Sequence, residues 1–108
     1  MPKSLADRLL DQAAQMTKLA CATTGEESER AFERAQDCRY YASKASLRAL
    51  RKGTEGYAAI AAEMEKSGKA LEQASQALAR PGEAIAEIAT ALDAVARLIV
   101  VIVGVLSL

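Results

Sequence analysis

The residue types that most often carry out chemistry are scarce in this sequence. Its 108 residues include two cysteines, Cys21 and Cys38, fourteen acidic and fourteen basic side chains, and no histidine. Histidine is the commonest general base and the commonest metal ligand among side chains. Without it, neither a Ser-His-Asp triad nor a histidine-containing zinc site can form. We therefore expect no catalytic residue and no metal site, and we expect the protein not to be an enzyme.

The two cysteines are expected to lie apart from each other. They fall on different predicted helices, and a turn centred on Thr24 would place Cys21 opposite a position near residue 27. That position is about 11 residues, or roughly 16 Å along a helix, from Cys38. Neither a disulfide nor a shared metal fits such a separation. Each cysteine is interpreted as a small apolar core residue.

No other pattern indicates a ligand with a defined chemistry. The glycines have neither the phosphate-loop spacing nor the dinucleotide spacing, and most acidic residues fall on the predicted outer faces of helices. The net charge is zero, so no overall field attracts nucleic acid. We expect no cofactor, no small-molecule substrate and no nucleic-acid partner.

The charges of residues 26–52 are segregated. Residues 26–37 hold five acids and two arginines, whereas residues 38–52 hold five bases and no acid. One interpretation is that these charges complement the dipole of a single long helix. The other is a basic patch beside Tyr40 and Tyr41 that contacts phosphate or lipid headgroups, with its candidate contacts at Lys44, Arg48, Arg51 and Lys52. The first is favoured because no second basic element supports the patch.

The elements that must position these residues are all helical. The chain is rich in alanine, has two prolines and lacks asparagine, a composition that favours helices over strands and turns. Ser4, Thr24 and Thr54 are placed as N-caps, and Gly53 and the Pro81-Gly82 pair are placed as helix ends. Three-four apolar spacing predicts helices over residues 5–22, 26–52, 55–79 and 83–108.

Loops of two or three residues require consecutive helices to be antiparallel neighbours. The predicted fold is an all-α, up-down antiparallel bundle of three long helices plus a shorter N-terminal helix, in one domain spanning residues 1–108. A turn centred near residue 81.5 makes facing residues of the last two helices sum to about 163. It pairs Leu78 with Ile85, Leu71 with Leu92, Met64 with Ile99, Tyr57 with Leu106, and Gly68 with the region of Val95. The first turn pairs Met16 with Phe32.

The last predicted helix becomes apolar on every side. No charge follows Arg97, and the chain ends Leu-Ile-Val-Val-Ile-Val-Gly-Val-Leu-Ser-Leu. A helix that is apolar all round must be surrounded by protein or lipid. We predict that Ile102 packs inward against Ala61 and Ile60, and that Val101 faces outward. The residues predicted to form an assembly or membrane interface are Leu98, Val100, Val101, Val103, Val105 and Leu108.

Three interpretations of this apolar end remain open. Neighbouring copies of the chain cover it, or a membrane receives it, or it is simply the core of the bundle. The eleven uncharged residues from Leu98 make only about 16 Å of helix, roughly half the hydrocarbon thickness of a bilayer. A longer membrane segment must carry Arg97, whose side chain would have to reach the interface.

The sequence therefore predicts a non-enzymatic structural or interaction protein that self-associates through its apolar C-terminal helix. The alternative is a membrane-associated or membrane-inserting helical protein, either tail-anchored or pore-forming. The expected partners are another copy of the chain and, in the alternative, membrane lipid. Two cysteines and an N-terminus without the apolar core of a secretory signal indicate the cytoplasm, or attachment to or anchoring at the inner membrane.

Overall fold

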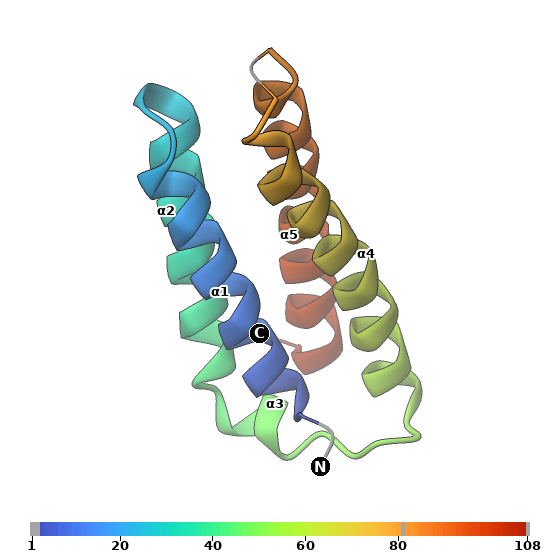
Figure 1. Ribbon diagram of the computed structural model, residues 1–108. Coiled ribbons are helices and arrows are strands. Elements are labelled where there is room, and N and C mark those ends of the chain that lie inside the picture. Colours follow the sequence, from blue (N-terminus) through green and yellow to red (C-terminus); the bar gives the residue numbers. More distant parts are fainter. Residues whose placement is uncertain (1–2, 81, 108) are drawn as a thin grey trace.

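The computed structural model describes residues 3–80 and 82–107, which form five helices and no strand. The helices are α1 (Leu5–Cys21), α2 (Gly25–Ala42), α3 (Ala45–Arg48), α4 (Glu55–Ala77) and α5 (Ala84–Leu106), shown in Figure 1. The bundle measures 42 × 24 × 20 Å. The predicted all-α class is confirmed, and Leu108 of the predicted interface lies outside the described residues.

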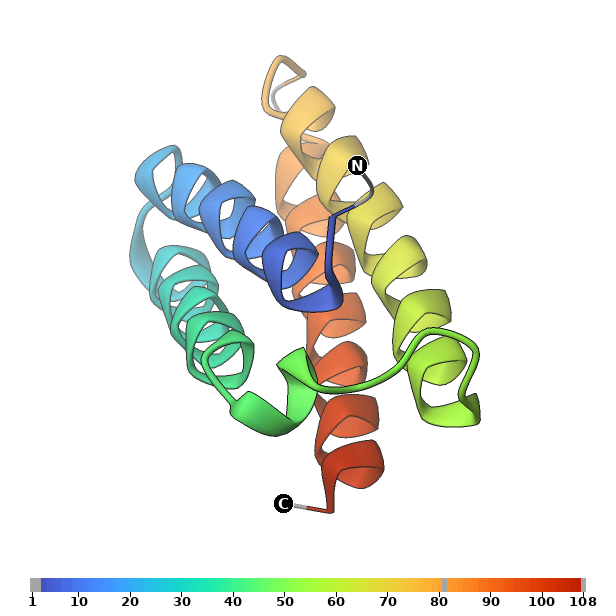
Figure 2. The same cartoon turned by 90° about the horizontal axis from the view of Figure 1, so that it is seen from below.

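The four longer helices form two hairpins, α1–α2 and α4–α5, whose members pack extensively on each other. Along the chain the helices alternate in direction, as predicted (Figure 1). The hairpins meet through α1 on α4 and α2 on α5, and Figure 2 shows this arrangement from below. In the described part of the chain, α2 and α4 are not a packed pair. The prediction that all consecutive helices are neighbours is therefore wrong for α2 and α4, which lie diagonally across the bundle.

The predicted helix over residues 26–52 is correct as far as Ala42, where α2 ends, and wrong beyond it. The Ser43 hydroxyl donates to the Tyr40 carbonyl at 2.6 Å, and Lys44 is extended with ψ 128°. Such local side-chain bonds compete with helix continuation. A straight continuation would leave the chain far from the diagonal start of α4. Instead, α3 and residues 49–54 cross the end of the bundle, held there by the buried side chain of Leu47.

Two of the three predicted N-caps form as expected. The Ser4 hydroxyl accepts a hydrogen bond from the Asp7 backbone N–H at 3.1 Å, and the Thr54 hydroxyl accepts one from the Tyr57 N–H at 3.2 Å. Each bond satisfies one of the backbone donors that the first turn of a helix leaves without a partner.

Thr24 precedes α2, but its side chain makes no capping hydrogen bond. The hydroxyl groups at this turn serve the end of α1 instead. Thr23 donates to the Leu19 carbonyl at 2.8 Å and Ser28 donates to the Ala20 carbonyl at 2.7 Å. The turn is therefore held by satisfying the carbonyls that end α1, rather than by the N–H groups that begin α2.

The core combines small side chains from α2 with large ones from the other long helices. The buried residues of α2 are Ala31, Ala35, Cys38 and Ala42, which let α2 approach its neighbours closely. Phe32 lies one position round the helix from Ala31 and is 42% exposed, whereas Met16 is fully buried. The predicted Met16–Phe32 pairing is wrong for this reason. The largest fully buried side chains are Leu9, Met16, Leu19, Leu47, Ile60, Met64, Leu71, Ile88, Leu92, Val95, Leu98 and Ile102.

The register of the second hairpin is close to the predicted one. A Cβ added at Gly56 would lie 2.6 Å from a Val105 methyl group, so residues that sum to 161 are in contact where the sequence predicted about 163. Gly68 does not face Val95 as predicted, since a Cβ added there would meet only the Gln12 amide, at 3.6 Å. The absence of a side chain at Gly68 instead leaves room for α1.

A buried polar cluster joins the two hairpins at that point. The Gln12 side-chain amide donates to the Met64 carbonyl at 2.9 Å, and the Ser67 hydroxyl donates to the Gln12 side-chain oxygen at 2.7 Å. Gln12 and Ser67 are the buried polar residues of the described chain. Buried polar atoms are tolerated when they are hydrogen-bonded, so α1 and α4 must keep this register.

We predict that Ser67→Ala destabilises the protein by about 1–3 kcal/mol, because it leaves the buried Gln12 oxygen without its donor. Ser75→Ala is the matched control, since Ser75 is exposed on the same helix and gains the same helix propensity. That control should change stability by about 0.5 kcal/mol or less. Urea unfolding followed by circular dichroism measures both. Equal effects of the two substitutions would contradict a structural role for the cluster.

Candidate functional site

The two cysteines are free and differ in environment. Cys38 is buried and Cys21 is exposed, so the prediction of a core residue is correct for Cys38 and wrong for Cys21. Burial, aided by the nearby Asp37 carboxylate, raises the pKa of the Cys38 thiol to about 12. A thiol held protonated in this way is neither a nucleophile nor a metal ligand at neutral pH. Within residues 3–80 and 82–107, no three acidic or cysteine side chains are grouped to hold a metal ion.

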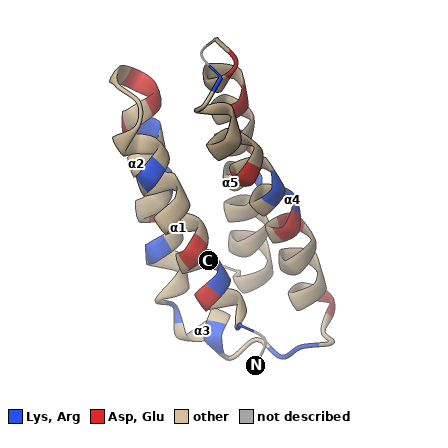
Figure 3. Ribbon diagram, in the orientation of Figure 1, with Lys and Arg blue, Asp and Glu red and all other residues tan. Residues whose placement is uncertain are grey.

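The four residues of the predicted basic patch lie at one end of the bundle, but not on α2. Lys44, Arg48, Arg51 and Lys52 follow the end of that helix, on α3 and the segment that leads to α4. Figure 3 shows this concentration of basic residues at one end of the bundle. Only Arg39 lies in the last turn of α2. The interpretation of all five bases as partners of one helix dipole is therefore wrong.

Local contacts hold two of these bases in place. The Lys44 ammonium group lies 4.2 Å from the centre of the Tyr40 ring, a cation–π contact, and that ring packs edge-on against Tyr41 at 5.0 Å. Arg48 donates to the Ala42 carbonyl at the end of α2, at 3.2 Å. Arg51 and Lys52 are exposed. In the described part of the chain, none of the four patch residues forms an ion pair with an acidic side chain.

The inward face of α5 accounts for only part of its apolar surface. Its buried residues are Ile88, Ala91, Leu92, Val95, Leu98 and Ile102. Leu98 is fully buried within the bundle, so its assignment to an interface with another molecule is wrong. Ile102 is also fully buried, as predicted. Ile85 was predicted to face Leu78 in the core, but it is 66% exposed and Leu78 is 36% exposed.

The outward face of α5 follows a regular stripe. Val100 is 70% exposed, whereas Val101, Val103 and Val105 are half-buried. The valine that points most fully away from the bundle is therefore Val100, not Val101 as predicted. We define the outer stripe of α5 as its exposed positions at three-four spacing: Ala86, Thr90, Asp93, Arg97, Val100 and Gly104.

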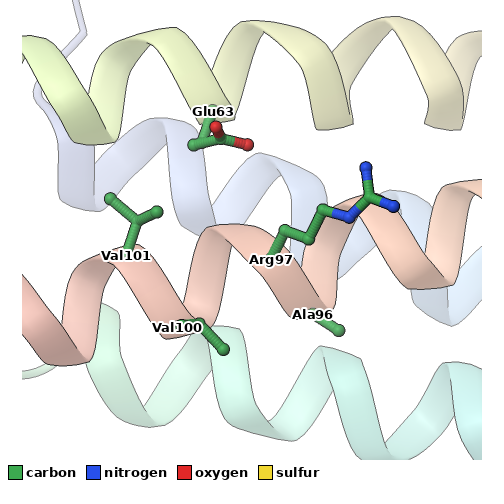
Figure 4. A pocket seen from close by; sticks show the side chains of 5 residues that line it. All are labelled: Glu63, Ala96, Arg97, Val100 and Val101. Carbon is green, nitrogen blue, oxygen red and sulfur yellow. The ribbon is translucent and has the colours of Figure 1, made fainter.

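An open, largely apolar groove of about 400 Å³ runs beside this stripe. It is lined by Glu63 of α4 and by Ala96, Arg97, Val100 and Val101 of α5. Figure 4 shows Val101 extending from α5 toward α4, with Glu63 across from it. The groove continues the exposed surface of the outer stripe onto the junction of the second hairpin. Its lining contains no arrangement of groups typical of catalysis.

A second hollow, of about 250 Å³, lies at the opposite end of the bundle between the two hairpins. It is lined by Thr23, Thr24 and Glu27 on one hairpin and by Ile85 on the other. The exposure of Ile85 results from this separation, because no large side chain of the first hairpin reaches it.

The charged residues of the outer stripe differ in their partners. Asp93 lies 3.5 Å from the Arg30 guanidinium of α2, and both side chains are exposed. Among the ion pairs of the described residues, none involves Arg97. From the sequence, Asp93 is expected to be solvated or paired, and Arg97 is expected to reach the interface if the segment enters a membrane. The signal for their shared face was their spacing of four, which places both on one side of a helix.

Among the described residues, one helix is long and apolar enough to cross a membrane by length and composition, and that helix is α5. Core helices of soluble proteins can have the same composition, but they are mostly buried. Of the 18-residue segment that meets the criterion, 33% is buried in the bundle. Much of an unusually apolar helix therefore lies uncovered in the single chain.

Comparisons with protein-family models, curated proteins and solved structures found no match to this chain. Its function must therefore be inferred from the surfaces described above.

We predict that an alkylating reagent at about pH 8 modifies Cys21 in the native protein and leaves Cys38 unmodified until the chain unfolds. Peptide mass spectrometry before and after denaturation measures this difference.

The raised pKa of Cys38 also has a consequence for stability. The unfolded thiol ionises from its ordinary pKa of 9.0, while the folded thiol stays protonated to about 12. This thiol therefore lowers the free energy of unfolding as the pH rises through that range, and Cys38→Ala should lessen the fall. Rapid native labelling of Cys38 would contradict its burial.

Proposed function

We propose that this protein is a non-enzymatic interaction or structural protein that self-associates through the outward face of α5. The observation that carries the proposal is the combination of an apolar composition with only 33% burial of the most apolar segment. A strongly apolar helix that its own chain covers only in part is typical of an interaction site. In this chain the surface comprises the outer stripe and the adjoining groove.

The distribution of charge along the chain supports the same surface. Helices α4 and α5 both have 23 residues, but α4 carries six charged residues where α5 carries three. The exposed side of α4 holds Glu65, Lys66, Lys69 and Glu72. A face that must stay in water is normally charged in this way. The corresponding face of α5 carries two charges, Asp93 and Arg97, both near its middle, and is otherwise uncharged, which favours contact with protein.

We predict that Val100→Asp reduces self-association at least about tenfold while the bundle remains folded, since it places a charge on a surface that another copy must cover. Ile102→Asp should instead unfold the bundle, because an unpaired charge would lie in the core. Circular dichroism reports folding, and light scattering coupled to size exclusion reports the mass in solution.

The control for charge alone is Gln73→Asp, which introduces the same charge at an exposed position of α4, away from the stripe. This change should not weaken association. A wild-type protein that stays monomeric at micromolar to millimolar concentration without detergent would contradict the proposal. So would a Val100→Asp variant that associates as strongly as the wild type.

Membrane association is a second candidate, supported by the ends of the helices. At 1.5 Å per residue, the 23 residues of α5 extend about 34 Å, near the hydrocarbon thickness of a bilayer. Val105 contacts Gly56 at the start of α4, and the basic segment with Arg51 and Lys52 leads into that same end. An apolar helix end beside basic side chains suits an anionic membrane surface.

We predict for this second candidate that the protein sediments with vesicles containing anionic lipid more than with zwitterionic vesicles. Arg51→Glu with Lys52→Glu should reduce that binding about tenfold or more, by about 1 kcal/mol for each basic residue removed and further through repulsion. Lys66→Glu with Lys69→Glu, on α4, is the control for the same change in net charge. Equal loss in both variants, or no binding to either type of vesicle, would contradict a membrane role for the basic segment.

A further inference from the structure

We propose that two copies of this chain pair through their α5 helices in an antiparallel arrangement, with Asp93 of each copy facing Arg97 of the other. This inference depends on the proposed function, namely self-association through α5, and specifies its geometry. The occupant of the outward face is a second copy of the same face, related by a two-fold axis near residue 95.

The spacing of the outer stripe is symmetric about that point. In a two-fold pair of antiparallel helices, each residue faces one whose number gives a constant sum. A sum of 190 pairs Ala86 with Gly104, Thr90 with Val100, and Asp93 with Arg97. All six residues are exposed on the same side of α5. A single two-fold rotation therefore places each of them opposite its paired residue in the second copy.

The side chains at these positions suit close packing of two helices. Gly104, Ala86 and Thr90 are small, and small residues let helix backbones approach. The large exposed Val100 then faces Thr90 of the second copy, which leaves room for it. Because the helices run in opposite directions, their dipoles are also opposed, which is favourable. A parallel pairing would instead place each Val100 against its own equivalent.

Charge decides between the two directions. In the antiparallel pairing, each Asp93 carboxylate meets an Arg97 guanidinium, and the two-fold axis makes this contact twice. In a parallel pairing, Asp93 would face Asp93 and Arg97 would face Arg97. Like charges placed directly opposite each other disfavour a complex. Arg30, 3.5 Å from Asp93, would add a second cation beside each carboxylate and extend the pair into a network.

Charge reversal tests the pairing directly. Asp93→Arg places arginine against Arg97 of the second copy and should weaken association about tenfold or more. Arg97→Asp should do the same through two facing carboxylates. The variant with both changes restores opposite charges across the axis. Because Arg30 lies beside position 93, all proteins are compared in an Arg30→Gln background, where the double variant should return to within about threefold of the protein that carries Arg30→Gln alone. Sedimentation equilibrium measures all four proteins. Failure of the double variant to recover would overturn the pairing.

Cross-linking tests the direction of the helices. In a Cys21→Ser background, Thr90→Cys and Val100→Cys are prepared separately, and each is oxidised alone and after mixing. Antiparallel pairing predicts a cross-linked dimer only in the mixture. In each variant alone, equivalent thiols would be ten residues or roughly 15 Å apart, beyond disulfide reach. Parallel pairing predicts cross-links in each variant alone.

The outcomes separate this inference from the proposal on which it depends. A wild-type monomer would overturn both. If the wild type is a dimer and each cysteine variant cross-links on its own, self-association through α5 is supported and the antiparallel geometry is overturned. A wild-type dimer without cross-links in any sample would place the contact elsewhere and overturn the inference as well. Cross-links restricted to the mixture, together with recovery in the charge-reversed double variant, support it.

Discussion

The contact between the two hairpins depends on one small polar cluster buried in an otherwise apolar core. The Gln12 side chain bonds to the Met64 carbonyl and to Ser67, and so links α1 to α4. Apolar contacts between alanine-rich helices are tolerant of sliding, because Ala surfaces are nearly uniform. A buried amide is not, since any shift leaves its polar atoms unpaired. Gly68 has no side chain and so leaves room for the amide. Gly68 on α4 and Gln12 on α1 therefore determine the same register.

The position of α5 and the path of the chain follow from that contact. With α1 against α4, α2 lies against α5 and diagonally across from α4. The chain must therefore cross the end of the bundle, and residues 43–54 do so through the short helix α3. Leu47 fills the end of the core during this crossing. In the single chain, the small residues of α2 cover one side of α5 and α4 covers another. The outer stripe is left facing outward.

The sequence was sufficient to predict the helices that bury one apolar stripe and begin after an N-cap residue. Helix α1 matches its prediction within a residue, and the register of α4 on α5 matches within two. The break after Ala42 could not be predicted from spacing, because alanine and arginine continue a helical pattern that the Ser43 hydrogen bond and the diagonal packing interrupt. Phe32 was misplaced for a related reason: the core accepts alanine from α2 and has no space for a ring. On α5, the sequence could not show which valine points outward. The segment after Arg97 is apolar on every side, so it has no polar face from which the orientation of the helix can be predicted.

The location of Asp93 and Arg97 distinguishes the environments that could cover α5. Both lie within two residues of position 95, the middle of a helix that spans residues 84–106. In a membrane-spanning orientation, the middle of the helix is the middle of the bilayer, where each unpaired charge costs about 2.5–3.5 kcal/mol. In an antiparallel pair, the same middle is the two-fold axis, where each charge meets an opposite one. The position of Asp93 and Arg97 at the middle of α5 therefore disfavours a lone helix in lipid and favours an antiparallel pair of helices. Within one chain Asp93 has Arg30 beside it, but Arg97 forms no ion pair among the described residues. A lone α5 in lipid would leave the Arg97 charge unpaired, whereas a second copy gives it Asp93.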